Sequence, residues 1–131
     1  GLDVETAAHA KRVAFAAADA ALAASGTVAL ELAAADTPMV SAYDMNWLSR
    51  RIVQRMMQID TANLINIVSD TRTVPEFIGA QCRSDLIAQG VLDLLQDPAP
   101  QRAAMQTTMD LLGRNGEDPG LRAARAVLAR L

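Results

Sequence analysis

The sequence is poor in the residues that support disulfides, metal sites and histidine-based catalysis. It contains one cysteine, Cys82, and one histidine, His9, among 131 residues. A single cysteine excludes an internal disulfide and fits a reducing compartment. No spacing of His and Cys residues matches a zinc site, so we expect no metal and no cofactor. With one histidine and no partner grouping around it, a Ser-His-Asp triad is not proposed.

Long apolar runs and an excess of positive charge are also missing. No stretch approaches the roughly 20 apolar residues that a membrane-spanning helix needs, and no signal peptide is visible. The formal net charge of −3 argues against a general nucleic-acid binder, whose surface would be basic. Aromatic residues make up only 3% of the chain, so aliphatic side chains and close helix contacts must form the core.

The sequence does contain enough apolar residues for one folded domain. They amount to 51% of the chain, whose length suits one core and is too short for two. The first part predicts a helix, a buried strand, a small-residue turn, a second helix and a second strand. These elements are expected at residues 5–17, 20–24, 25–27, 28–35 and 39–43. Strand, turn, helix and strand together form one βαβ unit, typical of an α/β fold with a parallel sheet.

The second part predicts mostly helix. We expect an amphipathic helix, an extended apolar stretch, a loop and a short element over residues 46–59, 62–68, 69–73 and 74–78. Three further helices are expected over residues 85–96, 101–112 and 119–131. The predicted organisation is a single helix-rich α/β domain, with a βαβ-type portion over about residues 1–80 and C-terminal helices over about residues 84–131.

The sharpest local motif is the turn Ser25-Gly26-Thr27 between a strand and a helix, with Glu31 one helical turn further on. Unpaired backbone N–H groups at a helix start, together with the helix dipole, form an anion site. Glu31 shares a helix face with Thr27, so its carboxylate would reach a ribose whose phosphate lies at the turn. The alternative is that Ser25 or Thr27 only caps the helix while Glu31 complements its dipole, and spacing alone favours this alternative.

For two further groups of residues the sequence allows two roles each. Asn66 is a single amide within Leu64-Ile65-Asn66-Ile67-Val68, where it would either contact a ligand or tie down a loop backbone. Arg50, Arg51 and Arg55 form a basic helix face. That face is either a solvated surface, which the pattern alone favours, or a contact for phosphate or an anionic membrane.

Several of these motifs, in one register, resemble lipid-A-disaccharide synthases. The run from Ala17 to Glu31, through the Ser-Gly-Thr turn, is similar to the corresponding stretch of that family. Pro38-Met39-Val40 with Tyr43 resembles its "PMV…Y" strand, and Leu64-Ile65-Asn66-Ile67 resembles its "LPN" segment. Val74-Pro75-Glu76-Phe77-Ile78 resembles the element that follows. The resemblance runs from about His9 to the end of the chain.

The resemblance implies a partial Rossmann-like C-terminal domain of a GT-B glycosyltransferase. The family transfers 2,3-diacylglucosamine from UDP to 2,3-diacylglucosamine 1-phosphate (lipid X), giving lipid A disaccharide and UDP. The implied contacts are Ser25, Gly26 and Thr27 with pyrophosphate, Glu31 with ribose, Asn66 with catalysis, and Tyr43 and Glu76 with the UDP-sugar. The implied place of action is the inner face of the cytoplasmic membrane in Gram-negative bacteria.

The chain also departs from the family pattern. Ile65 and Asp44 stand where the family usually has Pro and often has Arg. Since the chain opens with Gly1, and nothing in it corresponds to the family's N-terminal domain, we expect a truncated chain that is inactive alone. That domain is an implied partner, and a homo-oligomer is left open. The alternatives are another UDP-GlcNAc-type GT-B enzyme and a non-catalytic helical interaction module.

Overall fold

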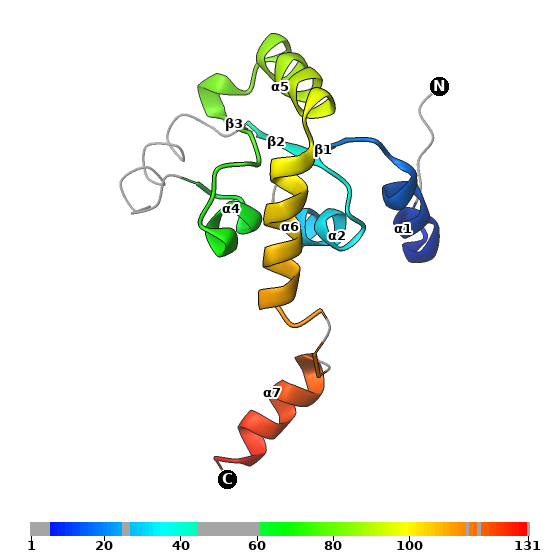
Figure 1. Ribbon diagram of the computed structural model, residues 1–131, viewed down its shortest axis with the longest axis vertical. Helices are drawn as coiled ribbons and strands as arrows, with labels where there is room; N and C mark the ends of the chain where they lie inside the picture. Colours follow the sequence, from blue (N-terminus) through cyan, green and yellow to red (C-terminus); the bar gives the residue numbers. More distant parts are fainter. Residues whose placement is uncertain (1–5, 25–26, 45–60, 115, 118, 131) are drawn as a thin grey trace.

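The computed structural model describes residues 6–24, 27–44, 61–114, 116–117 and 119–130. At its centre is a parallel sheet of three strands in the order β1-β2-β3 (Figure 1). The strands are β1 (Ala21–Ala23), β2 (Met39–Tyr43) and β3 (Glu76–Ile78). In the observed register Ala21 pairs with Met39, and Ser41 pairs with Glu76. The predicted α/β fold with a parallel sheet is confirmed.

Helices make up most of the rest of the described chain. They are α1 (Ala8–Ala17), α2 (Thr27–Ala34), α4 (Leu64–Ser69), α5 (Ser84–Gln96), α6 (Ala99–Leu111) and α7 (Pro119–Leu128), with a short 3-10 turn at Gly79–Gln81. Most lie within a few residues of the predicted helices. The helix predicted over residues 46–59 lies outside the described residues.

One prediction of local structure is wrong, because residues 64–69 form helix α4 rather than an extended stretch. The side-chain oxygen of Asn63 caps this helix by accepting a hydrogen bond of 2.9 Å from the backbone N–H of Ile65. At the other end Asp70 adopts a left-handed conformation with φ 52°, which ends the helix. Capping and packing against α6 therefore override the extended preference of the β-branched residues.

The sheet separates two helical layers, which Figure 1 shows on opposite sides. Met39 of β2 belongs to the core shared with α2, α4 and α6. The other face of the sheet is covered by α5, where Gly90 lies against the ring of Phe77 and a side-chain methyl of Val40. The closeness of that ring explains why a glycine faces it, since an added Cβ would lie 2.8 Å from two ring atoms.

Helix α6 is bonded to the sheet through the side chain of Gln101, which is only 1% exposed. Its side-chain oxygen accepts from the Met39 N–H at 2.6 Å, and its Nε2 donates to the carbonyl oxygens of Met39 at 2.9 Å and Thr73 at 3.0 Å. One buried amide thus joins β2 to the segment that leads into β3.

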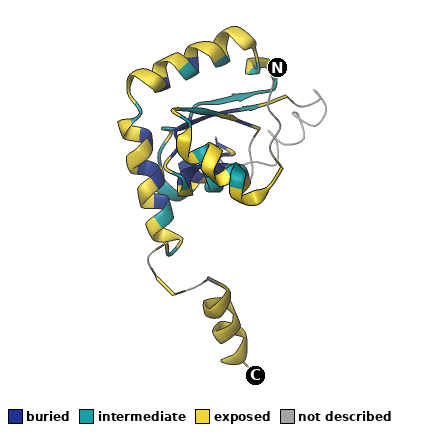
Figure 2. Cartoon of the chain, turned by 90° about the vertical axis from the view of Figure 1, so that its right-hand side faces the viewer, coloured by how far each residue is buried: buried dark blue, intermediate teal, exposed yellow. Residues whose placement is uncertain are grey.

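Beyond α6, helix α7 extends away from the sheet (Figure 2). The described side chains along it are exposed. Arg114, which precedes it, donates a hydrogen bond of 2.8 Å to the carbonyl of Ala34 at the end of α2. Helices α2 and α6 are therefore held together at their ends as well as through the core.

We expect Gln101→Met to destabilise the fold by about 2–4 kcal/mol, because the substitution keeps the side-chain size and removes the partner of two buried backbone groups and one partly buried group. The free energy of unfolding can be measured by denaturant titration followed by circular dichroism. Gln106→Met, at an exposed position of the same helix, is the matched control and should change stability little. Equal losses in the two variants would contradict the role assigned to Gln101.

Candidate functional site

The carboxyl edge of the sheet is where a parallel α/β fold places its ligands. Strand β1 ends at Ala23, and α2 begins at Thr27, whose side chain is exposed. Ser25 and Gly26 of the predicted turn lie outside the described residues. Because a helix begins at Thr27, its first backbone N–H groups have no helical partners and face this edge. The observed strand–helix junction thus agrees with the geometry that the anion-site prediction requires.

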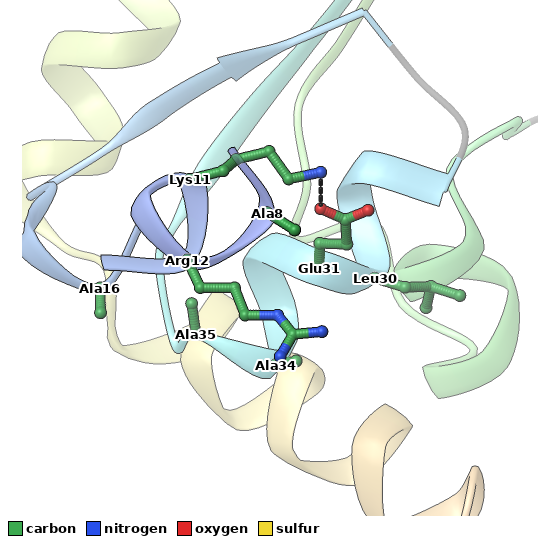
Figure 3. A pocket seen from close by; sticks show the side chains of 8 residues that line it. All are labelled: Ala8, Lys11, Arg12, Ala16, Leu30, Glu31, Ala34 and Ala35. Carbon is green, nitrogen blue, oxygen red and sulfur yellow. Dashed lines mark ion pairs between the residues drawn. The ribbon is translucent and has the colours of Figure 1, made fainter. Parts of the chain in front are cut away.

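Glu31 lies on α2 and forms an ion pair with Lys11 of α1 (Figure 3). The Lys11 Nζ atom is 2.5 Å from the Glu31 Oε2 atom, and the two side chains are 36% and 42% exposed. Glu31 is the fifth residue of α2, past the first turn, so its main electrostatic partner is this ammonium group rather than the helix dipole. The carboxylate is partly open to solvent, as a ligand contact requires.

A pocket of about 530 Å³ adjoins this ion pair, between α1 and α2. Small apolar residues form much of its lining, with Lys11, Arg12 and Glu31 as its charged members. Figure 3 shows the Lys11 and Arg12 side chains coming from α1 and the Glu31 side chain from α2. Two cationic groups and one carboxylate give this lining a net positive charge, and on α2 the lining extends toward the C-terminal end of the helix.

Asn66 and Glu76 are brought together by the hydroxyl of Thr61. This hydroxyl donates to Glu76 Oε2 at 2.6 Å and accepts from Asn66 Nδ2 at 3.2 Å. Glu76 also accepts from the backbone N–H of Ala62 at 3.1 Å. The Asn66 side chain is 1% exposed and exchanges hydrogen bonds of 2.9 and 3.0 Å with the carbonyl and N–H of Val74. Of the two roles left open for Asn66, the observed one is the tying of a loop backbone, and contact with substrate stays a prediction.

Of the remaining residues predicted for the site, the structure describes only one. Tyr43 is the last residue of β2, so it lies at the carboxyl edge, and it is 45% exposed. The basic face of Arg50, Arg51 and Arg55 lies outside the described residues. Within the described ranges no hydrogen bond or ion pair connects the Glu31 group with the Asn66–Glu76 group.

Sequence reasoning missed three residues that organise these groups: Lys11, Thr61 and Asn63. For Asn63 a signal existed, because an asparagine directly before an apolar run is a typical helix N-cap. Lys11 and Thr61 carry no such local signal, since their partners belong to other elements.

The described part of the chain has neither a cluster of metal ligands nor a helix suited to span a membrane. No group of three or more His, Cys, Asp or Glu side chains lies close enough together there to hold a metal ion. None of the helices in that part has the length and apolar character needed to cross a membrane.

We expect Asn66→Asp to lower the free energy of unfolding by about 3 kcal/mol at pH 7, because a buried carboxylate would face the Val74 carbonyl. Burial and that carbonyl favour the protonated form, so the pKa of the introduced carboxyl is higher in the folded than in the unfolded state. The deficit relative to wild type should therefore grow as the pH rises above about 4, the pKa of an unfolded aspartate.

Denaturant titrations of the variant and wild type between pH 4 and 8 measure this deficit. Ile67→Asp, at an exposed position of the same helix, is the control and should show little dependence on pH. A deficit for Asn66→Asp that stays constant over this range would rule out the buried bonding observed for Asn66.

Comparisons with known proteins agree with the geometry. The family model described as lipid-A-disaccharide synthetase matches residues 2–127. The chain is 60% identical over 131 residues to the lipid-A-disaccharide synthase of Ruegeria pomeroyi, an alignment that covers 100% of this chain and 33% of that protein. It is 45% identical over 120 residues to the enzyme of the same name from Paramagnetospirillum magneticum, covering 88% of this chain and 31% of that protein.

A third relative, the lipid-A-disaccharide synthase of Rhodospirillum centenum, is 42% identical over 118 residues, with 88% of this chain and 29% of that protein covered. The chain therefore spans about a third of the length of the curated relatives that it matches. Since the family model matches nearly the whole chain, the chain belongs to the lipid-A-disaccharide synthase family.

Proposed function

We propose that the chain is the UDP-sugar-binding part of a lipid-A-disaccharide synthase. The reaction of the whole enzyme, a hexosyltransferase, would join UDP-2,3-diacylglucosamine to 2,3-diacylglucosamine 1-phosphate and release UDP. The observation that carries this proposal is the 60% identity to the Ruegeria pomeroyi synthase along the full chain. We further propose that residues 1–131 form a single C-terminal domain of the GT-B type.

The proposed contacts follow the carboxyl edge of the sheet. Ser25, Gly26 and the N–H groups that open α2 at Thr27 would bind the pyrophosphate. Glu31 would accept hydrogen bonds from the ribose hydroxyls, which a carboxylate with exposed oxygens can do. Tyr43, at the end of the adjacent strand, would border the sugar.

Asn66 and Glu76 would contribute to the same site indirectly, by holding nearby segments of the chain in place. Both amide atoms of Asn66 are engaged with Val74 and Thr61, which favours a positioning role over direct contact with the reacting sugar. Glu76 fixes residues 61–62 in the same way. In this proposal, the part that Asn66 plays in catalysis is to hold the segment between α4 and β3 in place.

Both alternative functions are less well supported. Membership of the synthase family disfavours a different UDP-GlcNAc-type enzyme. A parallel sheet with crossover helices is also not the architecture of a helical interaction module.

Transfer of the sugar needs a second domain, opposite this one, to complete the active site. A domain that binds the donor cannot by itself align donor and acceptor, and alignment supplies much of the rate enhancement. We therefore propose that an N-terminal domain of the type found in this family provides the acceptor site, and that the chain alone does not form disaccharide from UDP-diacylglucosamine and lipid X.

The acylated substrates favour action at a membrane surface on the cytoplasmic side. In this proposal Arg50, Arg51 and Arg55 attract anionic lipid, and each arginine near such a surface contributes about 1 kcal/mol. Co-sedimentation of the chain and its triple Arg→Gln variant with anionic and zwitterionic vesicles tests this peripheral association.

The nucleotide assignment is tested with Glu31→Ala. We expect this variant to bind UDP more weakly by roughly 1.5–3 kcal/mol, because a hydrogen bond to a charged acceptor is lost. Binding of inorganic phosphate should be nearly unchanged, since phosphate has no ribose. Both affinities can be measured by isothermal titration calorimetry.

Asp85→Ala, which removes an exposed carboxylate from α5 on the opposite face of the sheet, serves as the control. Equal weakening of UDP and phosphate by Glu31→Ala would refute the ribose assignment. No binding of UDP to the wild-type chain would refute the proposed site as a whole.

A further inference from the structure

The carboxylate of Glu31 is held by one of its two oxygens. Its Oε2 atom lies 2.5 Å from the Lys11 ammonium group, whereas Oε1 has no partner among the described residues. A carboxylate accepts hydrogen bonds at both oxygens. Lys11 therefore fixes the direction of the side chain, and Figure 3 shows the other oxygen on the side of the carboxylate that faces away from Lys11.

Lys11 is itself held in place. Its Nζ atom lies 5.8 Å from the centroid of the Phe15 ring, within the range of a cation–π interaction. Phe15 is four residues further along α1, so the two side chains are neighbours on one face of that helix. The ammonium group thus has two partners, one on its own helix and one on α2, which restrict it to one place.

Arg12 provides a natural comparison within the same pocket. It follows Lys11 directly and contributes a cation to the same lining, and Figure 3 shows its side chain along α2 near Ala34. The ion pair to Glu31 is made by Lys11 and not by Arg12. Substituting each residue in turn therefore distinguishes the specific contact with Glu31 from the general positive charge of the pocket.

We propose that Lys11 is a positioning residue that presents Glu31 to the ribose hydroxyls of a uridine nucleotide. This inference rests on the proposed function. Without Lys11, the Glu31 side chain regains its rotational freedom, and its free oxygen is no longer held toward the ligand. The preference for a nucleotide with a complete ribose diol should then decrease.

The test compares the dissociation constants of UDP and 2′-deoxyuridine 5′-diphosphate by calorimetry. Their ratio reports the ribose contact, because a general effect of charge on the phosphates cancels. Wild type should prefer UDP, and Lys11→Met should reduce this preference about two- to fivefold, the effect expected for a half-exposed ion pair. Lys11→Arg, which keeps a donor and the charge, should restore most of it. Arg12→Met, which removes a cation that makes no ion pair with Glu31, should leave the ratio unchanged.

The outcomes separate this inference from the proposed function. If wild type shows no preference and Glu31→Gln changes nothing, the ribose assignment fails and the role of Lys11 fails with it. If wild type prefers UDP and Glu31→Gln loses the preference while Lys11→Met keeps it, only the role of Lys11 is overturned. Equal reductions of the ratio in Lys11→Met and Arg12→Met would likewise overturn it. Thermal unfolding followed by circular dichroism establishes that each variant is folded.

Discussion

Gln101 connects backbone groups that are distant in the sequence, and the position of helix α6 against the sheet depends on these hydrogen bonds. The first residue of β2 and the segment that enters β3 both bond to its amide. Buried backbone groups without partners are costly, so an internal side chain that satisfies three backbone groups also fixes the place of its own helix. Helix α6 can then pack against both α2 and α4.

A second group of polar residues satisfies its own hydrogen bonds at the start of β3. Thr61, Asn66 and Glu76 satisfy one another and the backbone of residues 62 and 74. Such a network specifies one arrangement of the chain, because any shift leaves a buried polar group unpaired. The Lys11–Glu31 pair differs in kind, since it is half-exposed and contributes little to stability. The buried network therefore supports the fold, while the half-exposed pair orients a carboxylate that solvent can reach.

The sequence patterns predict the βαβ unit well, and they do so for physical reasons. Short apolar runs on both sides of a small-residue turn leave few alternatives, and the strand predicted over residues 39–43 is observed as Met39–Tyr43. The prediction fails at α4, where β-branched residues favour an extended chain and the cap at Asn63 reverses that preference. The roles of Gln101 and Lys11 depend on contacts between separate elements. Gln101 lies 62 residues from Met39, and no local pattern indicates that pairing.

The central claim is that a uridine nucleotide binds where α2 begins. Hydrogen–deuterium exchange of the chain with and without saturating UDP tests this claim most directly. The first N–H groups of a helix have no helical partners and exchange quickly when free, so bound phosphate should slow them strongly. We predict added protection at residues 27–31 and unchanged exchange in α5, which lies on the opposite face of the sheet. Unchanged exchange at residues 27–31, or protection confined to α5, would contradict it.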